Sequence, residues 1–416
     1  MTQKKLIIVG NGMAAGRMVD ELRARDAERF AITIIGDEIH GSYNRIMLSP
    51  VLSGETTAHS IVQKTAEWYA NNNITFLGGV RVTGIDQHAQ TITCDNGNQL
   101  DYDELIIATG SRPARIPAKN QALAGVMAFR TLNDVDTILQ RSQTAQHAIV
   151  VGGGLLGLEA AYGMAVRGIK VILIHRSGWL LNRQLDKASG KMLEKVMASK
   201  GVEFRLGVEI DTFLGEGHVT GARLNSGEVL PCQIAIIATG ITPNAELGLE
   251  AGLEGNRGIK VDDYLTTSHP NISAIGECTE HNGQTFGLVE PIWQHCISLA
   301  DRLCLNLQTA YQNTPVATKL KVSGVQVFSA GEWMTAEHHR EFVYSDPARH
   351  IYRKLILDNN RLVGIVFFGD VRDGQYFFEL MEYGVDVINA MPQLLMGRAF
   401  CAQLPEIQLQ PDEVAA

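Results

Sequence analysis

The chain has 416 residues, of which 45% are hydrophobic and 19% charged, a composition typical of a folded protein with two or three domains. Its net charge of −9 argues against a nucleic-acid-binding protein, which would present a basic face, and weakly against binding to anionic membranes. The sequence lacks an uninterrupted apolar run of about 18 residues, and its first apolar strand begins too early for a cleavable signal. We therefore expect a cytoplasmic protein.

The first predicted unit contains a glycine-rich motif between a strand and a helix. Three elements open the chain: a buried strand over residues 4–10, a helix over residues 13–25 and a second strand over residues 30–38. The glycines of the motif GNGMAA permit a tight turn and let backbone N–H groups approach a pyrophosphate. The second strand ends at Asp37 and Glu38, where a carboxylate would bind an adenosine ribose, and we favour Glu38.

The second predicted unit repeats this plan. Its elements are a strand over residues 148–154, a helix over residues 155–167 and a strand over residues 170–176. The motif with Gly152, Gly154 and Gly157 matches GxGxxG in full. The second strand ends at His175 and Arg176. An acid there would indicate NADH, whereas a basic pair could accept the 2′-phosphate of NADPH, so both donors stay open.

The sequence IIATG occurs once in each unit, at residues 106–110 and 236–240. Each copy predicts a closing strand whose small residues let the backbone approach the flavin or the pyridine nucleotide. A third strand, within residues 271–280, ends at Gly276 and Glu277, where a carboxylate can bind the ribityl or pyrophosphate part of FAD. Two dinucleotide motifs in one chain indicate that electrons pass between two dinucleotides.

The sequence changes character after Pro315. Alternating apolar runs predict antiparallel strands, and residues 375–391 predict one or two helices. The predicted fold class is α/β, with two Rossmann-like dinucleotide-binding domains and a smaller α+β C-terminal domain. We expect a discontinuous FAD-binding domain (1–115 and 241–315), an NAD(P)H-binding domain (116–240) and a C-terminal domain (316–416) that serves dimerisation or partner docking.

In this order, the landmarks resemble the pyridine-nucleotide-disulfide reductase superfamily over about residues 4–307. The CxxxxC pair of the disulfide reductases is absent, because residues 41–50 read GSYNRIMLSP. Further segments are similar to the flavoprotein portion of bacterial assimilatory NAD(P)H-nitrite reductase and to the electron-transfer subunit of assimilatory nitrate reductase. They include YNRIMLSPVLSGE, VVGGGLLGLEAA, LNRQLD, GITPN, AIGEC, GLVEPIWQ and TKLKVSGVQVFSAG.

The resemblance implies a glutathione-reductase-like fold and an enzyme that takes hydride from NADH, or alternatively NADPH, onto FAD. The chain ends at Ala416 without the family's iron–sulfur and sirohaem modules. We therefore expect a reductase, monomeric or homodimeric, that passes electrons to a separate protein: a nitrate or nitrite reductase catalytic subunit, or a small iron–sulfur protein. A rubredoxin or ferredoxin reductase, an NADH oxidase and a non-enzymatic flavin or nucleotide redox sensor are the alternatives.

Two residues are predicted to be catalytic, and none to bind a metal. Arg45 is expected near the isoalloxazine, where a cation would stabilise the reduced flavin, and Glu159 on the nicotinamide side. His295 and Cys278 are expected to have packing roles. The predicted FAD contacts are Gly10, Gly12, Met13, Ala14, Ala15, Asp37, Glu38, Arg45, Val82, Ala108, Thr109, Gly110, Gly276, Glu277, Glu290, Pro291 and Trp293. The predicted NAD(P)H contacts are Gly152, Gly154, Leu155, Leu156, Gly157, Glu159, His175, Arg176, Ala238, Thr239 and Gly240.

Overall fold

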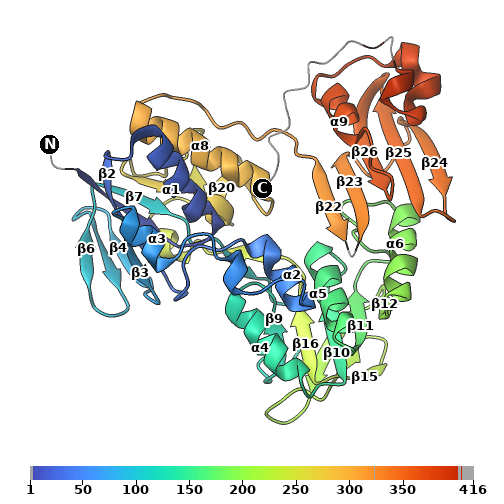
Figure 1. The fold of residues 1–416 in the computed structure, drawn as a ribbon, viewed down its shortest axis with the longest axis horizontal. Coiled ribbons are helices and arrows are strands. Elements are labelled where there is room, and N and C mark those ends of the chain that lie inside the picture. Colours follow the sequence, from blue (N-terminus) through green and yellow to red (C-terminus); the bar gives the residue numbers. More distant parts are fainter. Residues whose placement is uncertain (1–2, 323, 402–403, 405–416) are drawn as a thin grey trace. The chain divides into compact units, whose positions relative to one another are not determined.

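The computed structural model describes residues 3–322, 324–401 and 404 (Figure 1). The chain divides into two compact units. Unit 1 comprises Met1–Ile116, Ala128–Gln140 and Gly240–Thr314, and unit 2 comprises Pro117–Met127, Arg141–Thr239 and Pro315–Ala416. Among the described residues, none of the helices combines the length and apolar character that crossing a membrane requires.

Unit 1 is built on a five-stranded parallel sheet with the order β19-β7-β1-β2-β3. Its strands are β1 (Lys4–Val9), β2 (Phe30–Gly36), β3 (Thr75–Gly78), β7 (Glu104–Ile107) and β19 (Ile272–Ala274). The strand order reverses at β1, because β2 lies on one side of it and β7 on the other. In open α/β sheets, ligands bind at the carboxyl end of the strand where the order reverses, so this topology marks the end of β1.

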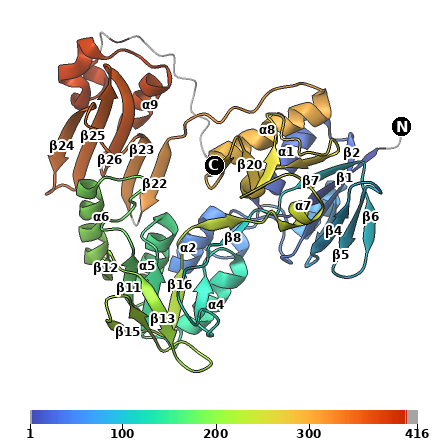
Figure 2. The same cartoon turned by 180° about the vertical axis from the view of Figure 1, so that it is seen from behind.

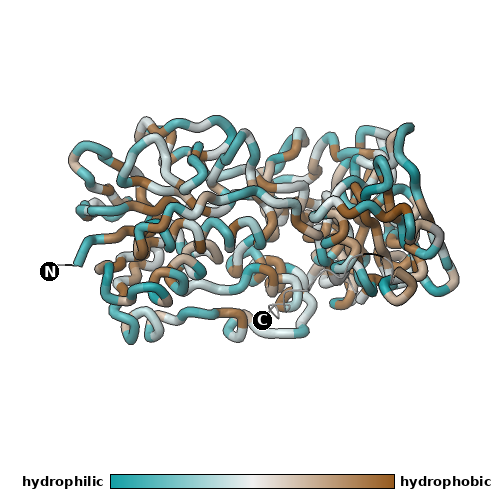
Figure 3. Tube along the Cα trace, turned by 90° about the horizontal axis from the view of Figure 1, so that it is seen from above, coloured by the Kyte–Doolittle hydropathy of each residue, from teal (hydrophilic) through white to brown (hydrophobic). Residues whose placement is uncertain are grey.

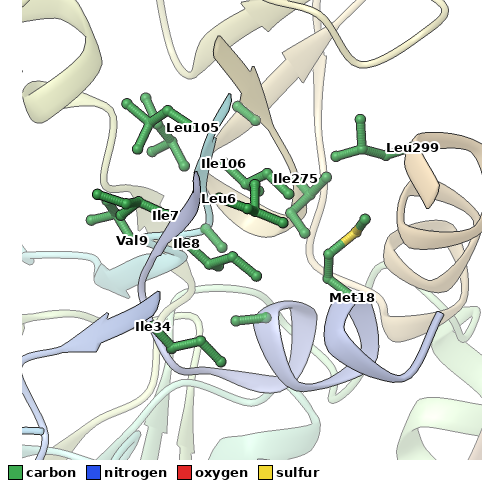
Figure 4. Close-up of a cluster of buried hydrophobic side chains, with 14 of the residues drawn as sticks. Leu6, Ile7, Ile8, Val9, Met18, Ile34, Leu105, Ile106, Ile275 and Leu299 are labelled. Carbon is green, nitrogen blue, oxygen red and sulfur yellow. The ribbon is translucent and has the colours of Figure 1, made fainter. Parts of the chain in front are cut away.

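The core of unit 1 lies between this sheet and two helices, α1 (Met13–Asp26) and α8 (Val289–Leu305) (Figure 4). Met18 of α1 and Leu299 of α8 point toward β1, where Leu6 and Ile8 are fully buried. Because a parallel sheet is covered on both faces, its strands are continuous apolar runs, as the sequence predicts. Each fully buried side chain of this size stabilises the fold by about 1.5–3 kcal/mol.

Smaller elements complete unit 1. Its short strands form an antiparallel sheet β4-β5-β6, a β8-β17 pair and a sheet β18-β20-β21. They are β4 (Val82–Asp86), β5 (Thr91–Cys94), β6 (Gln99–Asp101), β8 (Ser111–Pro113), β17 (Ile241–Pro243), β18 (Ile259–Val261), β20 (Thr279–His281) and β21 (Gln284–Thr285). The helices are α2 (Leu48–Ser53), α3 (Ala66–Asn71), α7 (Glu246–Glu250) and α4 (Leu132–Ser142), which continues into unit 2, with 3-10 turns at Arg45–Met47, His59–Ile61 and Gly276–Cys278.

The first part of unit 2 repeats the plan of unit 1. Its five-stranded sheet has the order β12-β11-β10-β16-β9 and again reverses at the strand that precedes a glycine motif, β10. The elements are β9 (Val126–Ala128), β10 (His147–Val151), α5 (Leu155–Val166), β11 (Lys170–His175), α6 (Lys187–Ser199), β12 (Val202–Leu206) and β16 (Ile234–Ile237). An antiparallel sheet of β13 (Ile210–Leu214), β14 (Gly221–Leu224) and β15 (Val229–Pro231) is inserted before β16.

The second part of unit 2 is an antiparallel sheet with the order β22-β23-β26-β25-β24 (Figure 2). It comprises β22 (Thr318–Val322), β23 (Val325–Gly331), β24 (Arg340–Asp346), β25 (Ile351–Asp358) and β26 (Arg361–Phe368), followed by α9 (Gly374–Glu382) and 3-10 turns at Ile388–Met396 and Arg398–Phe400. Phe367 of β26 packs edge-on against Phe377 of α9, with ring centroids 5.8 Å apart. The predicted fold class, α/β with two parallel sheets and an α+β C-terminal region, is confirmed.

Hydropathy follows this architecture. Hydrophobic stretches gather within the units, whereas many peripheral loops are hydrophilic (Figure 3). The sequence does not predict β24, because five of its seven residues are exposed and it lies at the edge of its sheet. The strands β4, β5 and β6 also escape prediction, because each has only three to five residues and little apolar alternation.

Candidate dinucleotide-binding sites

Gly10 makes the turn at the carboxyl end of β1. Its φ of +109° lies in the region that favours glycine, and a Cβ here would overlap the carbonyl oxygen of Ala108. Its N–H donates to the Ile35 carbonyl at 2.7 Å, and the Ala108 N–H donates to the Val9 carbonyl at 2.8 Å. The first glycine of the motif therefore lets the chain pass tightly between two neighbouring strands.

The helix that follows begins without a side-chain cap. Gly12 is the N-cap of α1 and, as a glycine, has no side chain to cap the first turn. A Cβ on Gly12 would meet only the Arg45 Nε, at 3.9 Å. A helix of 14 residues with an open N-terminus presents backbone N–H groups to an anion, so the end of α1 fits the pyrophosphate of FAD.

The second glycine motif has the same geometry in unit 2. Gly152 has a φ of +121°, its N–H donates to the Ile174 carbonyl at 2.8 Å, and a Cβ would overlap the Ala238 carbonyl oxygen. Gly154 is the N-cap of α5, again without a side-chain cap, and a Cβ on it would meet nothing within 4 Å. A Cβ on Gly157 would overlap the Gly152 carbonyl, which explains the third glycine. The open end of α5 fits a second pyrophosphate.

The two acids after β2 lie in different surroundings. The Glu38 carboxylate accepts hydrogen bonds from the Arg45 Nη2 at 2.5 Å and from the Tyr43 hydroxyl at 2.8 Å, and its side chain is 23% exposed. Asp37 pairs with Arg81 at 3.0 Å, and its side chain is 60% exposed. A fixed, half-buried carboxylate suits ribose recognition better, so this placement favours Glu38.

Arg45 and Glu277 belong to one polar network. The Arg45 Nη1 donates to the Arg130 carbonyl at 3.0 Å, and the Arg130 guanidinium forms an ion pair with Glu277. The Ser111 hydroxyl donates to the same carboxylate at 2.8 Å. The sequence predicts Arg45 beside the isoalloxazine, whereas the structure holds its guanidinium against Glu38, the carboxylate expected at the adenosine ribose.

The sequence does not identify Arg130 as a site residue. The available signal is the capping pattern that follows it: the Thr131 hydroxyl accepts from the Asp134 N–H at 3.1 Å, and the Asp134 carboxylate accepts from the Thr131 N–H at 2.9 Å. This pattern marks the start of α4. The ion pair with Glu277 spans 147 positions of sequence, so no local pattern could reveal it.

Three other predicted flavin contacts, Thr109, Gly276 and Val82, lie in unit 1. Asn244 of GITPN donates from its amide to the Thr109 carbonyl at 2.9 Å, and the Thr109 hydroxyl donates to the Asn244 carbonyl at 2.7 Å. A Cβ on Gly276 would lie 3.0 Å from the Ala14 Cβ, so the AIGEC segment reaches the start of α1. Val82 is buried at the start of β4.

The helix α8 begins at the predicted segment around Glu290. Its N-cap, Leu288, provides no side-chain cap, and Glu290 is exposed in the first turn. Pro291 is buried, and the Arg17 guanidinium lies 5.5 Å from the centre of the Trp293 ring.

His295 is a neutral core residue. It is fully buried, its Nδ1 accepts a hydrogen bond from the Gly276 N–H at 3.3 Å, and the rings of Phe286 and Tyr311 lie edge-on at 4.6 and 4.5 Å. Burial lowers the pKa of His295 to about 3. Cys278 is also buried, and burial raises the pKa of its thiol. The packing roles predicted for both residues agree with these surroundings.

His175 is tied to the second glycine loop. Its Nδ1 accepts from the Gly153 N–H at 3.1 Å, so its Nε2 carries the proton and donates to the Asn182 Oδ1 at 3.1 Å. Burial lowers the pKa of His175, which keeps the ring neutral. Of the predicted basic pair, only the exposed Arg176 supplies a charge. Glu159 is half-buried in the first turns of α5.

Two family models together match most of the chain. Residues 4–319 match the family model described as pyridine nucleotide-disulphide oxidoreductase, and residues 315–385 match that of the rubredoxin NAD+ reductase C-terminal domain. A nitrite reductase [NAD(P)H] of Bacillus subtilis is 40% identical over 93% of this chain and 48% of its own length. An assimilatory nitrate reductase electron transfer subunit of the same organism is 36% identical over 95% of this chain and 51% of its own length.

The chain thus spans about half the length of these curated relatives. Among solved structures, the covalent putidaredoxin reductase–putidaredoxin complex aligns with a TM-score of 0.84 at 25% identity, covering 96% of this chain and 97% of that one. The family implies binding of FAD and NAD(P)H, and the two open glycine loops fit these groups. The chain is an oxidoreductase that belongs to the pyridine nucleotide-disulphide oxidoreductase family.

Proposed function

We propose that this protein takes hydride from NAD(P)H onto FAD and passes the electrons to a separate redox protein, in nitrate or nitrite assimilation. One observation carries the proposal. Two glycine motifs, each at the reversal point of a parallel sheet, are followed by helices whose N-caps, Gly12 and Gly154, are glycines without a side-chain cap. A chain that binds one dinucleotide needs one such loop. Two loops, in units 1 and 2, support a donor and an acceptor of hydride.

FAD supplies two-electron acceptance from a nicotinamide and stepwise release to an acceptor. The residues of unit 1 bind and orient it. The end of α1 binds the pyrophosphate, and Glu38 accepts hydrogen bonds from the adenosine ribose. Arg45 holds Glu38 in place, and Arg130 does the same for Glu277 at the ribityl end. We assign Arg45 an anchoring role at the ribose through Glu38, and its charge stabilisation of the reduced isoalloxazine stays a prediction.

The residues of unit 2 bind the donor. The end of α5 binds its pyrophosphate, and Glu159 lies on the helix that would approach the nicotinamide. Arg176 rather than an acid directly follows β11, and it is the charged member of the basic pair. We therefore propose that both NADH and NADPH are used.

A protein acceptor is supported by the relatives. The matched proteins include a nitrate reductase electron transfer subunit, and the matched structure is a reductase bound covalently to putidaredoxin. All six cysteines of this chain are free and buried, so nothing favours a reductase that passes electrons through its own cysteines to a disulfide substrate. A rubredoxin or ferredoxin reductase is the second candidate, favoured by the C-terminal match at residues 315–385.

A pair of glycine variants tests the proposal. Gly154→Ala and Gly12→Ala place a methyl group no closer than 3.9 Å to the described atoms beyond their chain neighbours, so the fold should survive. The methyl group would block the approach of a pyrophosphate. We expect Gly154→Ala to keep bound FAD and to lose reduction by NAD(P)H about 100-fold, and Gly12→Ala to lose FAD itself.

Gly84 of β4 provides the control, since a Cβ on it would meet only the Thr93 Cβ, at 3.9 Å, and Gly84→Ala should change neither property. If Gly154→Ala were reduced by both donors at the wild-type rate, the second loop would not be the donor site. The proposal would then be wrong.

A further inference from the structure

The loop between β11 and α6, residues 176–186, lies beside the second glycine loop. The Leu181 N–H donates to the Gly153 carbonyl at 2.9 Å, and the Gly153 N–H donates to His175. Both backbone groups of Gly153 are therefore bound by residues of β11 or of this loop. The position of the glycine loop depends on the position of the loop over residues 176–186.

Leu181 of this loop has a backbone conformation that leucine does not favour by itself. It is fully buried and has a φ of +49°, a left-handed conformation that is uncommon for leucine. Such conformations persist only where the surroundings impose them, and they concentrate at functional sites. The next residue, Asn182, is bound by Trp333, which follows β23 of the antiparallel sheet in the C-terminal region.

Two groups of contacts join the loop to that sheet within unit 2. The Trp333 Nε1 donates to the Asn182 carbonyl at 3.0 Å. Asp186, the N-cap of α6, accepts hydrogen bonds from the Tyr352 hydroxyl at 2.6 Å and from the Lys354 Nζ at 3.3 Å. In both ribbon views, α6 lies beside the sheet that carries these residues (Figures 1 and 2).

The contacts of Asp186 are buried on both sides. Asp186, Tyr352 and Lys354 are 8, 4 and 5% exposed. Burial raises the pKa of Asp186, but hydrogen bonds from Tyr352 and Ser189 outweigh it, so the net direction is downward and the carboxylate is charged. Lys354 also pairs with Glu341 at 3.1 Å, which holds the ammonium group in place from the opposite strand. A buried charge pair of this kind resists displacement, because separating it would leave an unpaired charge.

We infer that Asp186 is a positioning residue for NAD(P)H: through Tyr352 and Lys354, the C-terminal sheet fixes residues 176–186 and thereby the glycine loop that receives the donor. The inference rests on the proposed donor site in unit 2. It assigns the C-terminal sheet an indirect part in donor binding. Tyr352 and Lys354 act on the loop through their contacts with Asp186. Changes on the sheet should therefore weaken donor binding and leave the FAD site of unit 1 intact.

The test uses Tyr352→Phe and Lys354→Met in the full-length, FAD-loaded protein. Both variants leave Asp186 in place as the cap of α6, where it also accepts from the Ser189 N–H at 3.0 Å. The matched controls are Tyr344→Phe on the neighbouring strand and Lys319→Met on β22, both exposed positions. FAD content and far-UV circular dichroism establish that each variant is folded.

We expect Lys354→Met to raise the KM for NAD(P)H about 10-fold, with kcat at saturating donor unchanged, and Tyr352→Phe to raise it less. Lys354→Arg should restore part of the loss, because it restores the charge. A merely structural contact would lower the melting temperature and leave the KM unchanged. That result would overturn the inference.

Hydrogen exchange separates this inference from the proposed function. The amides of Gly153 and Leu181 should exchange at least about fivefold faster in Lys354→Met than in Lys319→Met. If wild type were not reduced by either donor, the proposed function would fail, and the exchange rates would still decide whether the sheet holds the glycine loop. Equal exchange in the two variants would contradict the coupling.

Discussion

At the scale of single residues, two neighbouring carboxylates differ in how firmly they are held, because they have different hydrogen-bond partners. Asp37 and Glu38 are adjacent carboxylates, yet only Glu38 is held by two donors, Tyr43 and Arg45. The sequence predicts an acid at this strand end. Choosing between the two requires the contacts of residues five and seven positions further on.

Substitution of these acids should have unequal effects. Glu38→Gln removes the charge that would bind the ribose and leaves Arg45 without its ion pair, so we expect the Kd for FAD to rise about 10- to 100-fold. Asp37→Asn is the matched control, because its partner Arg81 is exposed and the pair contributes little. FAD binding to the apoprotein, followed by flavin fluorescence, measures both. Equal losses would show that Glu38 has no special role.

His295 predicts a pH dependence of stability. Its folded pKa, about 3, lies below the ordinary value of 6.5, so the unfolded chain binds the extra proton between these values. The free energy of unfolding should therefore fall as the pH drops below about 6.5, by about 2 kcal/mol from His295 between pH 7 and 5. His295→Asn keeps an acceptor for the Gly276 N–H without a titrating ring.

Urea unfolding of wild type and His295→Asn at pH 7 and pH 5 measures this contribution. The variant should lose less stability than wild type on acidification, since the carboxylates that titrate over the same range are common to both. A parallel loss in the two proteins would contradict a buried, neutral His295.

The position of Arg176 leads to a prediction about the choice between NADH and NADPH. It is the exposed charged residue at the end of β11, where the 2′-phosphate of NADPH would lie. Arg176→Gln should raise the KM for NADPH about 10-fold and leave that for NADH within about twofold. Steady-state kinetics with each donor and an artificial one-electron acceptor provides the test. Equal changes for both donors would mean that Arg176 does not read the phosphate.

At the scale of elements, the two strand–glycine–helix units are near copies. Gly10 and Gly152 have similar positive φ values, +109° and +121°, and a Cβ on either would overlap the carbonyl of the residue that follows the closing strand. Gly152→Ala should therefore lower the free energy of unfolding by at least about 2 kcal/mol, whereas Gly154→Ala should change it by less than about 1 kcal/mol. Chemical denaturation of unit 2, followed by Trp179 or Trp333 fluorescence, measures the difference. A stable Gly152→Ala variant would contradict the tight turn.

Many of the helices and strands can be predicted from the local sequence. The apolar runs before each glycine motif predict β1 and β10, because strands of a covered parallel sheet are buried on both faces. The edge strand β24 and the short strands β4 to β6 lack such a pattern. The partnerships of Arg130 with Glu277 and of Asp186 with Tyr352 join residues far apart in the chain. Only the folded topology brings these side chains together.

At the scale of the whole molecule, the central claim is the proposed transfer of electrons from a pyridine nucleotide to a protein, which rests on two glycine loops and on the reductase-type match of the C-terminal region. The most direct measurement is an anaerobic titration of the purified protein with NADH and then NADPH, following the flavin absorption near about 450 nm. We predict a yellow protein whose band is rapidly bleached by at least one donor. A protein without flavin, or with a flavin that neither donor reduces, would contradict the hydride relay.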